Sequence, residues 1–258
     1  MSTNGEERTQ APPESQSHGF QAAMDYMMLR KVDALLWLTR IGTMVFTILS
    51  MIPIFGVNPY TSYQRALMSN AATSALRLHQ RLPRVQLTRE FGATLLMEDS
   101  CHYLLYSILF IISYPITLSL LPIFLFAVLH SVHFSIIILN KLGHYNTWAT
   151  TSLTSIAENH QRNILRLVAF TEVTLMPLTI LWLFSGKGSL FTPFAYYRFL
   201  TFRYASRRNP YCRNVFHEMK ILLQNFASKP GRNVSIRNFC LTIIRVCSYF
   251  APPIVPQQ

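Results

Sequence analysis

One acidic residue, Glu172, interrupts an otherwise uncharged segment from Leu167 to Gly186. An ionisable side chain at the depth of a bilayer is costly and commonly marks a proton, ion or ligand site. The nearest basic residue, Arg166, lies six positions away, roughly 240° around a helix, so it cannot pair with Glu172 on the same face. Two interpretations stay open. The favoured one is an inward-facing or protonated structural glutamate, and the alternative is an ion or small-solute conduit that uses Glu172.

The other residue patterns that could support chemistry are weak. His130 and His133 have the i, i+3 spacing of a shared metal site, but the other six histidines are scattered, so we predict no metal centre. The segment from Glu98 to Ser100 precedes a long apolar run and predicts acidic capping at the start of a helix. The segment from Ser185 to Ser189 lacks P-loop spacing and predicts a turn.

Catalysis has no positive support in the sequence. No GxSxG, HExxH or GxGxxG motif occurs, and the four cysteines form no CxxC pair. We therefore predict that the protein is not an enzyme and needs no cofactor. A membrane-bound lipid enzyme is the least favoured alternative.

The elements that would position these residues are membrane helices. Half of the 258 residues are apolar and only 13% are charged, about half the roughly 25% of ordinary soluble proteins. Long stretches without charge predict membrane segments, since about 20 helical residues cross a bilayer. We expect an all-α, polytopic integral membrane protein, with segments at about 34–57, 101–140 and 164–186 and a weaker fourth at 189–204.

The second membrane stretch is too long for one straight span. Between Asp99 and Lys141 lie 141 − 99 − 1 = 41 uncharged residues, about twice the length needed. Pro115 and Pro122 fall near its middle, so a helical hairpin or sharply broken helix is expected, turning near Ser119 to Pro122.

Amphipathic segments connect and follow these spans. Residues 62–82 carry apolar residues at three-to-four spacing, which predicts a helix lying in the interface, and packing of this stripe on the protein's own helices is the alternative. The C-terminal region repeats this design in two stripes. We expect a disordered tail at 1–24, a membrane domain at 25–204 and a basic amphipathic cytosolic tail at 205–258.

The C-terminal region is strongly basic. The last 73 residues hold 11 of the 23 lysines and arginines and one acid, Glu218, which makes this region +10 of the chain's +12. No nucleic-acid-binding signature accompanies this charge, so anionic lipid headgroups are the expected partner and direct nucleic-acid binding is not. The positive-inside rule places the tail in the cytosol. Asn233, in a glycosylation-type sequence, should then remain unmodified.

Three long strings resemble one protein family: Tyr63 to Pro83, Glu98 to Ser107 and Ser185 to Arg213. They are similar to the transmembrane protein 33 family, which includes Krüppel homologue 2 and fungal nuclear-pore-associated proteins of the endoplasmic reticulum. The similarity covers roughly Tyr26 to Pro252. It implies residence in the endoplasmic reticulum membrane and nuclear envelope, about three spans, interplay with reticulon-type membrane-shaping proteins, a role in nuclear pore assembly and no enzymatic activity.

The predicted function is therefore non-catalytic: the protein organises or shapes tubular membrane and recruits partners. Five arginines should face headgroups or an acidic partner, and five apolar residues should insert into the membrane. The arginines are Arg198, Arg203, Arg207, Arg208 and Arg213, and the apolar residues are Phe216, Leu222, Phe226, Phe239 and Ile243.

Overall fold

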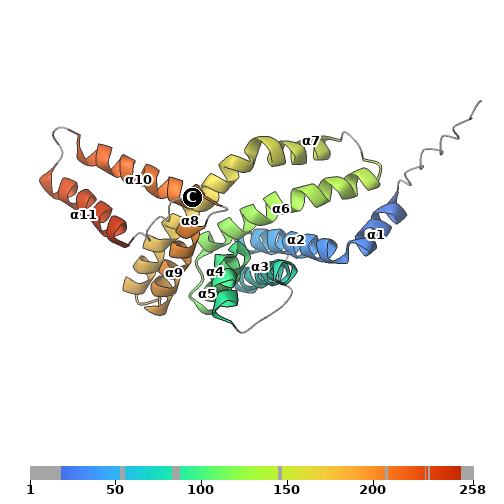
Figure 1. The fold of residues 1–258 in the computed structure, drawn as a ribbon, viewed down its shortest axis with the longest axis horizontal. Helices are drawn as coiled ribbons and strands as arrows, with labels where there is room; N and C mark the ends of the chain where they lie inside the picture. The colour runs from blue at the N-terminus through green and yellow to red at the C-terminus, as the bar shows by residue number, and fades with distance from the viewer. Residues whose placement is uncertain are drawn as a thin grey trace, which may run out of the picture.

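The computed structural model describes residues 19–52, 56–82, 88–144, 147–206, 209–229, 231 and 233–250, without the side chain of residue 250. Throughout these residues the chain is helical and contains no strand, so the all-α membrane fold is confirmed. Figure 1 shows an elongated helical bundle from which a pair of C-terminal helices projects.

The N-terminal part consists of a short helix and two long ones. Helix α1 is Phe20–Leu29, α2 is Lys31–Met51 and α3 is Pro59–Arg81. The predicted tail of 1–24 is thus helical from Phe20 onward, while residues 1–18 lie outside the described part. Helix α3 begins with Pro59 at its first position and with the Asn58 side chain accepting a hydrogen bond from the Tyr60 N–H, which is favourable chemistry for a helix start.

Helix α3 is a central helix of the bundle. It packs along α2 and crosses α5, Asp99–Ile112. Tyr63, Ala66 and Leu67 on its apolar stripe are buried. The first part of the stripe therefore packs on neighbouring helices of the same chain, as the alternative for residues 62–82 predicts, whereas Ala75 further along the stripe is exposed.

The long uncharged stretch is broken, as its prolines predict. It comprises α5, a 3₁₀ turn η2 at Thr117–Ser119 and α6 at Leu120–Lys141. Its arms do not form a tight hairpin, because α5 packs mainly on α3 and α9 (Phe191–Ala205), whereas α6 packs mainly on α2 and α8. A further bend of 80° separates α5 from α4, Arg89–Met97.

The next helices form one long rod. Helix α7 (Trp148–Ser155), a π-helical turn η3 (Ile156–His160) and α8 (Gln161–Phe184) follow one another without a break. The predicted turn after Phe184 is present, and Gly186 adopts a φ of 72° there, a conformation that glycine reaches without strain. Helix α9 then returns beside α8.

Three helical stretches are long and apolar enough to cross a membrane: Lys31–Met51, Thr117–Lys141 and Trp148–Phe184. The bent pair α4 and α5 makes a fourth if it counts as one span. Helix α9, the predicted weaker segment, is not among the candidates in the described part of the chain.

The main core lies where α3, α5, α6, α8 and α9 converge. Aromatic residues from α5 and α9 fill its centre, with Tyr106, Phe110 and Tyr196 completely buried. The ring centroids of Tyr106 and Phe110 are 4.7 Å apart, and those of Phe110 and Tyr196 are 5.6 Å apart. These contacts hold α5 and α9 together and thereby position the polar residues at one end of both helices.

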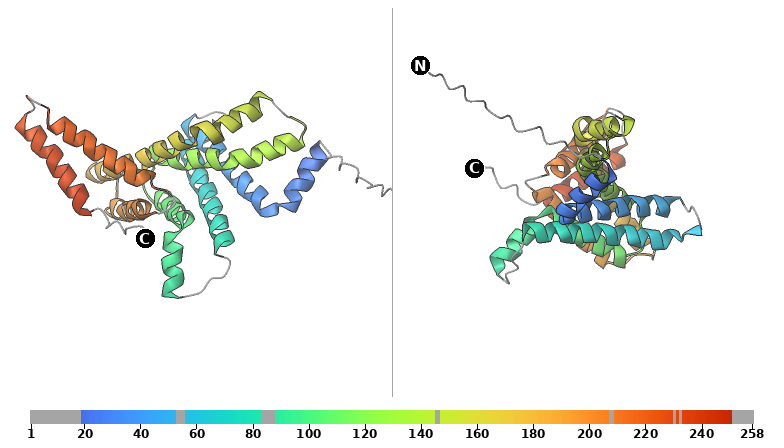
Figure 2. Two further views of the ribbon diagram at one scale, coloured as in Figure 1. Left: turned by 45° about the horizontal axis from the view of Figure 1, so that its top comes forward. Right: turned by 90° about the vertical axis from the view of Figure 1, so that its right-hand side faces the viewer.

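Helices α10 (Tyr211–Ala227) and α11 (Val234–Phe250) form a helical hairpin. The first half of α10 packs on α8 through Cys212 and Val215, against Ala169 and Val173. Beyond this attachment the α10–α11 hairpin extends away from the bundle (Figure 2).

Candidate functional site

A buried ion pair joins α8 to α9. The Arg203 Nε donates to both carboxylate oxygens of Glu172, at 3.1 and 3.2 Å. Glu172 is 0% exposed and Arg203 is 1% exposed. The Tyr103 hydroxyl on α5 also donates to Glu172, and its ring lies 5.2 Å from the Arg203 guanidinium carbon. The glutamate is therefore buried and faces inward, toward α5 and α9.

Glu172 does not stand alone, contrary to the expectation from its sequence neighbours. Its partner Arg203 is 31 positions away on another helix. Arg203, predicted to face headgroups or an acidic partner, is 1% exposed and pairs with carboxylates of its own chain. A buried carboxylate needs a charged and hydrogen-bonded partner, and Arg203 supplies both. The ion pair also removes the observation that motivated a conduit, which was an unpaired intramembrane acid.

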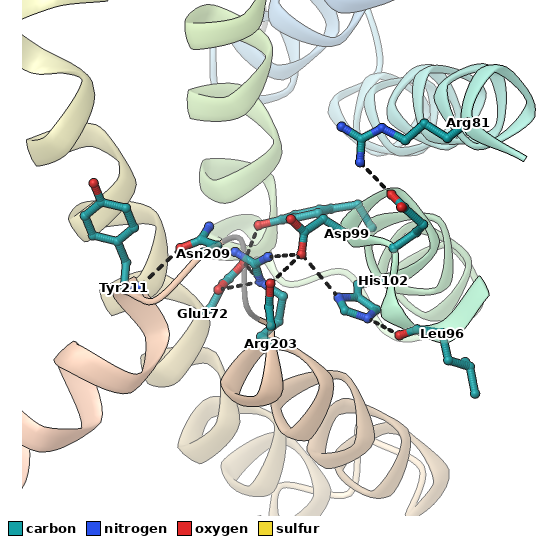
Figure 3. A network of polar contacts seen from close by, with 11 residues as sticks. Arg81, Leu96, Asp99, His102, Glu172, Arg203, Asn209 and Tyr211 are labelled. Carbon is teal, nitrogen blue, oxygen red and sulfur yellow. Dashed lines mark hydrogen bonds and ion pairs between the residues drawn. The ribbon is translucent and has the colours of Figure 1, made fainter. Parts of the chain in front are cut away.

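The ion pair extends into a polar network at the N-terminal end of α5 (Figure 3). The Arg203 Nη1 donates to the Asp99 carboxylate at 3.2 Å, and the Ser206 hydroxyl donates to the same oxygen at 3.0 Å. The Asp99 carboxylate is also 3.7 Å from the buried His102 imidazole. Asp99 therefore connects α5 to the end of α9.

A second ion pair closes the same end of the bundle. The Arg81 Nη1 lies 2.5 Å from the Glu98 carboxylate, which joins the C-terminal end of α3 to the residue that precedes α5. Glu98 makes no side-chain capping bond to α5, so the expected capping role is wrong for Glu98. Asp99 does lie in the first turn of α5, where a negative charge is favourable to the helix dipole.

A cavity of about 250 Å³ adjoins this network. Residues from α2, α3, α5, α6 and α9 line it, together with Asn209. Its charged lining residues are Arg40, Arg77, Arg81, Arg203 and Asp99. His130 also lines the cavity, but in the described part of the chain no hydroxyl or thiol is hydrogen-bonded to its ring. Among the described residues, no group of three histidine, cysteine, aspartate or glutamate side chains could hold a metal ion.

The α10–α11 hairpin presents a different surface. Leu222 is 66% exposed and Phe239 is 65% exposed, with Phe226 also exposed. Basic side chains accompany them, and the exposed ones are Lys220, Lys229, Arg237 and Arg245. Glu218 pairs with Arg166 of α8 at 2.6 Å. The described hairpin therefore combines large apolar side chains with a positive charge.

The predicted binding residues divide between buried and exposed positions. Arg198 is exposed and Arg213 is half-buried, whereas Arg207 and Arg208 lie outside the described residues. Phe216 packs against the α8–α10 cluster and the Tyr204 ring, whose centroid is 5.8 Å away. It is thus not free to insert, contrary to the prediction. Leu222, Phe226 and Phe239 are exposed and Ile243 is half-buried.

Sequence reasoning missed the partners of Glu172 and the arginines of the cavity. A signal for Arg203 was present, because Tyr196, Phe199, Leu200 and Arg203 follow the three-to-four spacing of one helix face, and all four are buried. Arg40 and Arg77 carry no comparable local signal, since their proximity depends on how α2 packs against α3.

Comparison with known proteins identifies the family. A family profile described as "Transmembrane protein 33/Nucleoporin POM33" matches residues 15–253. The chain belongs to this family. The relative named transmembrane protein 33 in Rattus norvegicus is 47% identical over 90% of this chain and 94% of its own length. The human protein of that name is 46% identical over the same shares.

More distant relatives cover most of the chain as well. Krueppel homolog 2 of Drosophila melanogaster is 39% identical over 83% of this chain and 78% of its own length. A transmembrane protein 33 homolog of Caenorhabditis elegans is 37% identical over 92% of this chain and 88% of its own length. No solved structure matches. The resemblance expected from the three strings is confirmed.

Proposed function

We propose that this chain is a non-catalytic protein of the endoplasmic reticulum membrane and nuclear envelope that organises or shapes tubular membrane. In this proposal it recruits nuclear pore components and reticulon-type membrane-shaping proteins. The family description, which includes a nucleoporin, supports the location and the association with the nuclear pore. The reticulon-type partners follow from what the family resemblance implies.

The observation that carries the proposal is the α10–α11 hairpin. Leu222 and Phe239 are about two-thirds exposed on a structure that projects from the bundle. Large exposed apolar groups beside lysine and arginine are typical of helices that lie on an anionic membrane surface. Anionic headgroups attract the basic residues by about 1 kcal/mol each, and this attraction fades with salt.

Apolar insertion would add a salt-resistant contribution. Complete burial of one leucine or phenylalanine side chain contributes about 1.5–3 kcal/mol, and interfacial burial contributes less. Curved membranes expose more of the packing defects that accept such side chains. Leu222 and Phe239 should therefore give the hairpin a preference for curved, anionic membrane.

The test uses the full-length protein with Leu222→Asp and Phe239→Asp. We expect it to lose its enrichment on narrow membrane tubes pulled from giant anionic vesicles, and on endoplasmic reticulum tubules in cells. The matched control is Gln224→Asp with Asn238→Asp, which adds the same charge at exposed polar positions of the same two helices. Equal enrichment of both double variants and the unmodified protein would reject the proposal.

A further inference from the structure

The cavity beside Arg203 is separate from the α10–α11 hairpin. It has a volume of about 250 Å³ and is lined by both arginines and neutral donors. Small-molecule pockets commonly have about 300–1,000 Å³, so this cavity suits a compact group. Its neutral polar lining residues are Thr43, Asn70, Thr73, Ser74, Ser100 and Asn209.

Positive charge exceeds negative charge around the cavity. Four arginines line it, and only one carboxylate, that of Asp99, does so. Arg81 is paired with Glu98, and Arg203 is paired with Glu172 and Asp99. Among the described residues, no carboxylate lies within ion-pair distance of Arg40 or Arg77. Two guanidinium groups from adjacent helices are thus left for another anion.

The environment of Arg77 supports this assignment. Burial lowers the pKa of its guanidinium, and the charge of Arg81 lowers it further, against a smaller opposing effect of Asp99 and Glu98. Arg40 donates one hydrogen bond, to the backbone oxygen of His130 at 2.9 Å, and this neutral acceptor does not balance its charge. An anion in the cavity would offset the repulsion between these cations.

An unsatisfied donor gives an independent indication. The Nη2 of Arg203 is buried and has no hydrogen-bond partner among the described residues. Arginine carries five N–H donors in a planar fork, and donors buried in proteins are rarely left without an acceptor. Arg203 is 1% exposed and lines the cavity, so an acceptor placed there could complete its hydrogen bonding.

We propose that this cavity binds a phosphate-bearing anion, supplied by a lipid headgroup or a free phosphate compound, through Arg40, Arg77 and Arg203. Guanidinium groups match the geometry of phosphate oxygens and form charge-assisted, often bidentate hydrogen bonds with them. The hydroxyl group of Ser74 lies in the same lining and can donate to a further oxygen, whereas the Thr43 hydroxyl donates to the Thr39 backbone oxygen at 3.0 Å. Asp99, the one carboxylate of the lining, already accepts hydrogen bonds from Arg203 and Ser206.

The position of the cavity suits a headgroup. The ion pairs Arg81–Glu98 and Arg203–Asp99 bring the C-terminal ends of α3 and α9 to the N-terminal end of α5. Helices α3 and α9 both end here, and the C-terminal region that follows α9 is expected in the cytosol. This expectation puts the proposed site on the side of the cytosolic headgroups.

The test compares two substitutions on one helix in the purified full-length protein. Arg77→Gln removes a cavity arginine, whereas Arg65→Gln removes an exposed arginine of α3 that does not line the cavity. One arm measures retention of phosphatidic acid by native mass spectrometry from phosphatidylcholine nanodiscs containing it. The other arm measures binding of glycerol 3-phosphate and inorganic phosphate by calorimetry.

We expect Arg77→Gln to weaken binding on the order of tenfold, as the loss of charge-assisted hydrogen bonds predicts, and Arg65→Gln to leave it unchanged. Binding of phosphatidic acid alone assigns the site to a lipid headgroup, and binding of the soluble probes assigns it to a free phosphate compound. Equal binding by the two variants, or no binding of any probe by the unmodified protein, would overturn the proposal.

Two further measurements separate this site from folding and from the hairpin. Without a probe, Arg77→Gln should keep or raise the melting temperature, because it relieves repulsion between arginines. Addition of the probe should raise the melting temperature of the unmodified protein more than that of the Arg77→Gln variant. Arg40→Gln tests the same site from α2. The hairpin variant with Leu222→Asp and Phe239→Asp should bind the probes normally, so failure of one proposal does not decide the other.

Discussion

Arginine and phenylalanine have opposite environments in the bundle and in the α10–α11 hairpin. In the bundle, Arg203 is 1% exposed and paired with carboxylates, and Phe199 is 4% exposed among other aromatic rings. In the hairpin, Phe239 is 65% exposed and Arg237 and Arg245 are exposed. The same residue types are therefore buried in one region and exposed in the other.

The comparison teaches that composition does not assign these residues a role. The sequence predicts that Arg198 and Arg203 of α9 face headgroups or an acidic partner, yet Arg203 is buried together with Tyr196 and Phe199 of the same helix. The hairpin has few helices around it and keeps its apolar residues exposed. Four predictions test how different the two regions are.

The largest expected difference concerns two cysteines. Burial, reinforced by Glu172, raises the pKa of Cys212 from 9.0 to about 12, which reduces its reactive thiolate about a thousandfold. In detergent, a water-soluble maleimide should therefore modify Cys212 at least about a thousandfold more slowly in the native than in the denatured protein. Cys247 is exposed and should show a much smaller ratio.

Mass spectrometry of peptides from a labelling time course checks both sites in one sample. Transfer from detergent to anionic nanodiscs should slow the reaction of Cys247 if the hairpin lies on the membrane. Equal native rates at Cys212 and Cys247 in detergent would show that the two regions are equally open.

The second prediction concerns the buried ion pair. Arg203→Met leaves Glu172 buried without its cation, and loss of one partner from a buried pair costs about 3–5 kcal/mol. Arg198→Met removes an exposed arginine from the same helix and should change stability by less than about 0.5 kcal/mol. Unfolding of both variants by denaturing detergent measures the difference. Coincident unfolding curves would contradict a structural role for the pair.

The third prediction concerns packing between α2 and α3. A Cβ atom at Gly42 would lie 2.8 Å from the Ser69 Oγ, which donates to the Thr39 backbone oxygen at 3.0 Å. Gly42→Leu should therefore destabilise the bundle by about 1–3 kcal/mol through overpacking.

Gly92 of α4 provides the matched control for Gly42. No atom lies within 4 Å of a Cβ atom built there, and leucine forms helices better than glycine. Gly92→Leu should be neutral or stabilising by up to about 1 kcal/mol. Thermal unfolding that ranks Gly42→Leu as the more stable variant would show that α2 and α3 are packed less closely than described.

The smallest expected effect lies where the hairpin joins the bundle. Arg166 and Glu218 form an ion pair with side chains 63% and 45% exposed. Exposed pairs contribute about 0–1 kcal/mol and are screened by salt. Glu218→Gln should thus lower stability only slightly at low salt and not at high salt. A large, salt-independent loss would mean that this pair, and not apolar packing at Cys212 and Val215, attaches the hairpin.

The sequence by itself determined the helical class, the membrane character and the family. Long uncharged stretches, the prolines at 115 and 122 and the turn after Phe184 are local features, and local features are encoded in adjacent residues. Periodicity also identified which face of α3 and α10 is apolar. It did not identify what covers that face.

Tertiary structure decided which apolar and charged residues are buried. Glu172 accepts hydrogen bonds from Arg203, 31 positions away, and from Tyr103, 69 positions away. The periodicity of a single helix cannot predict contacts between residues so far apart in the sequence. Arg40 and Arg77 meet only because α2 packs along α3. The physical reason is that a helix repeat records the direction of a side chain around its own axis, whereas burial and pairing depend on which other helices lie in that direction.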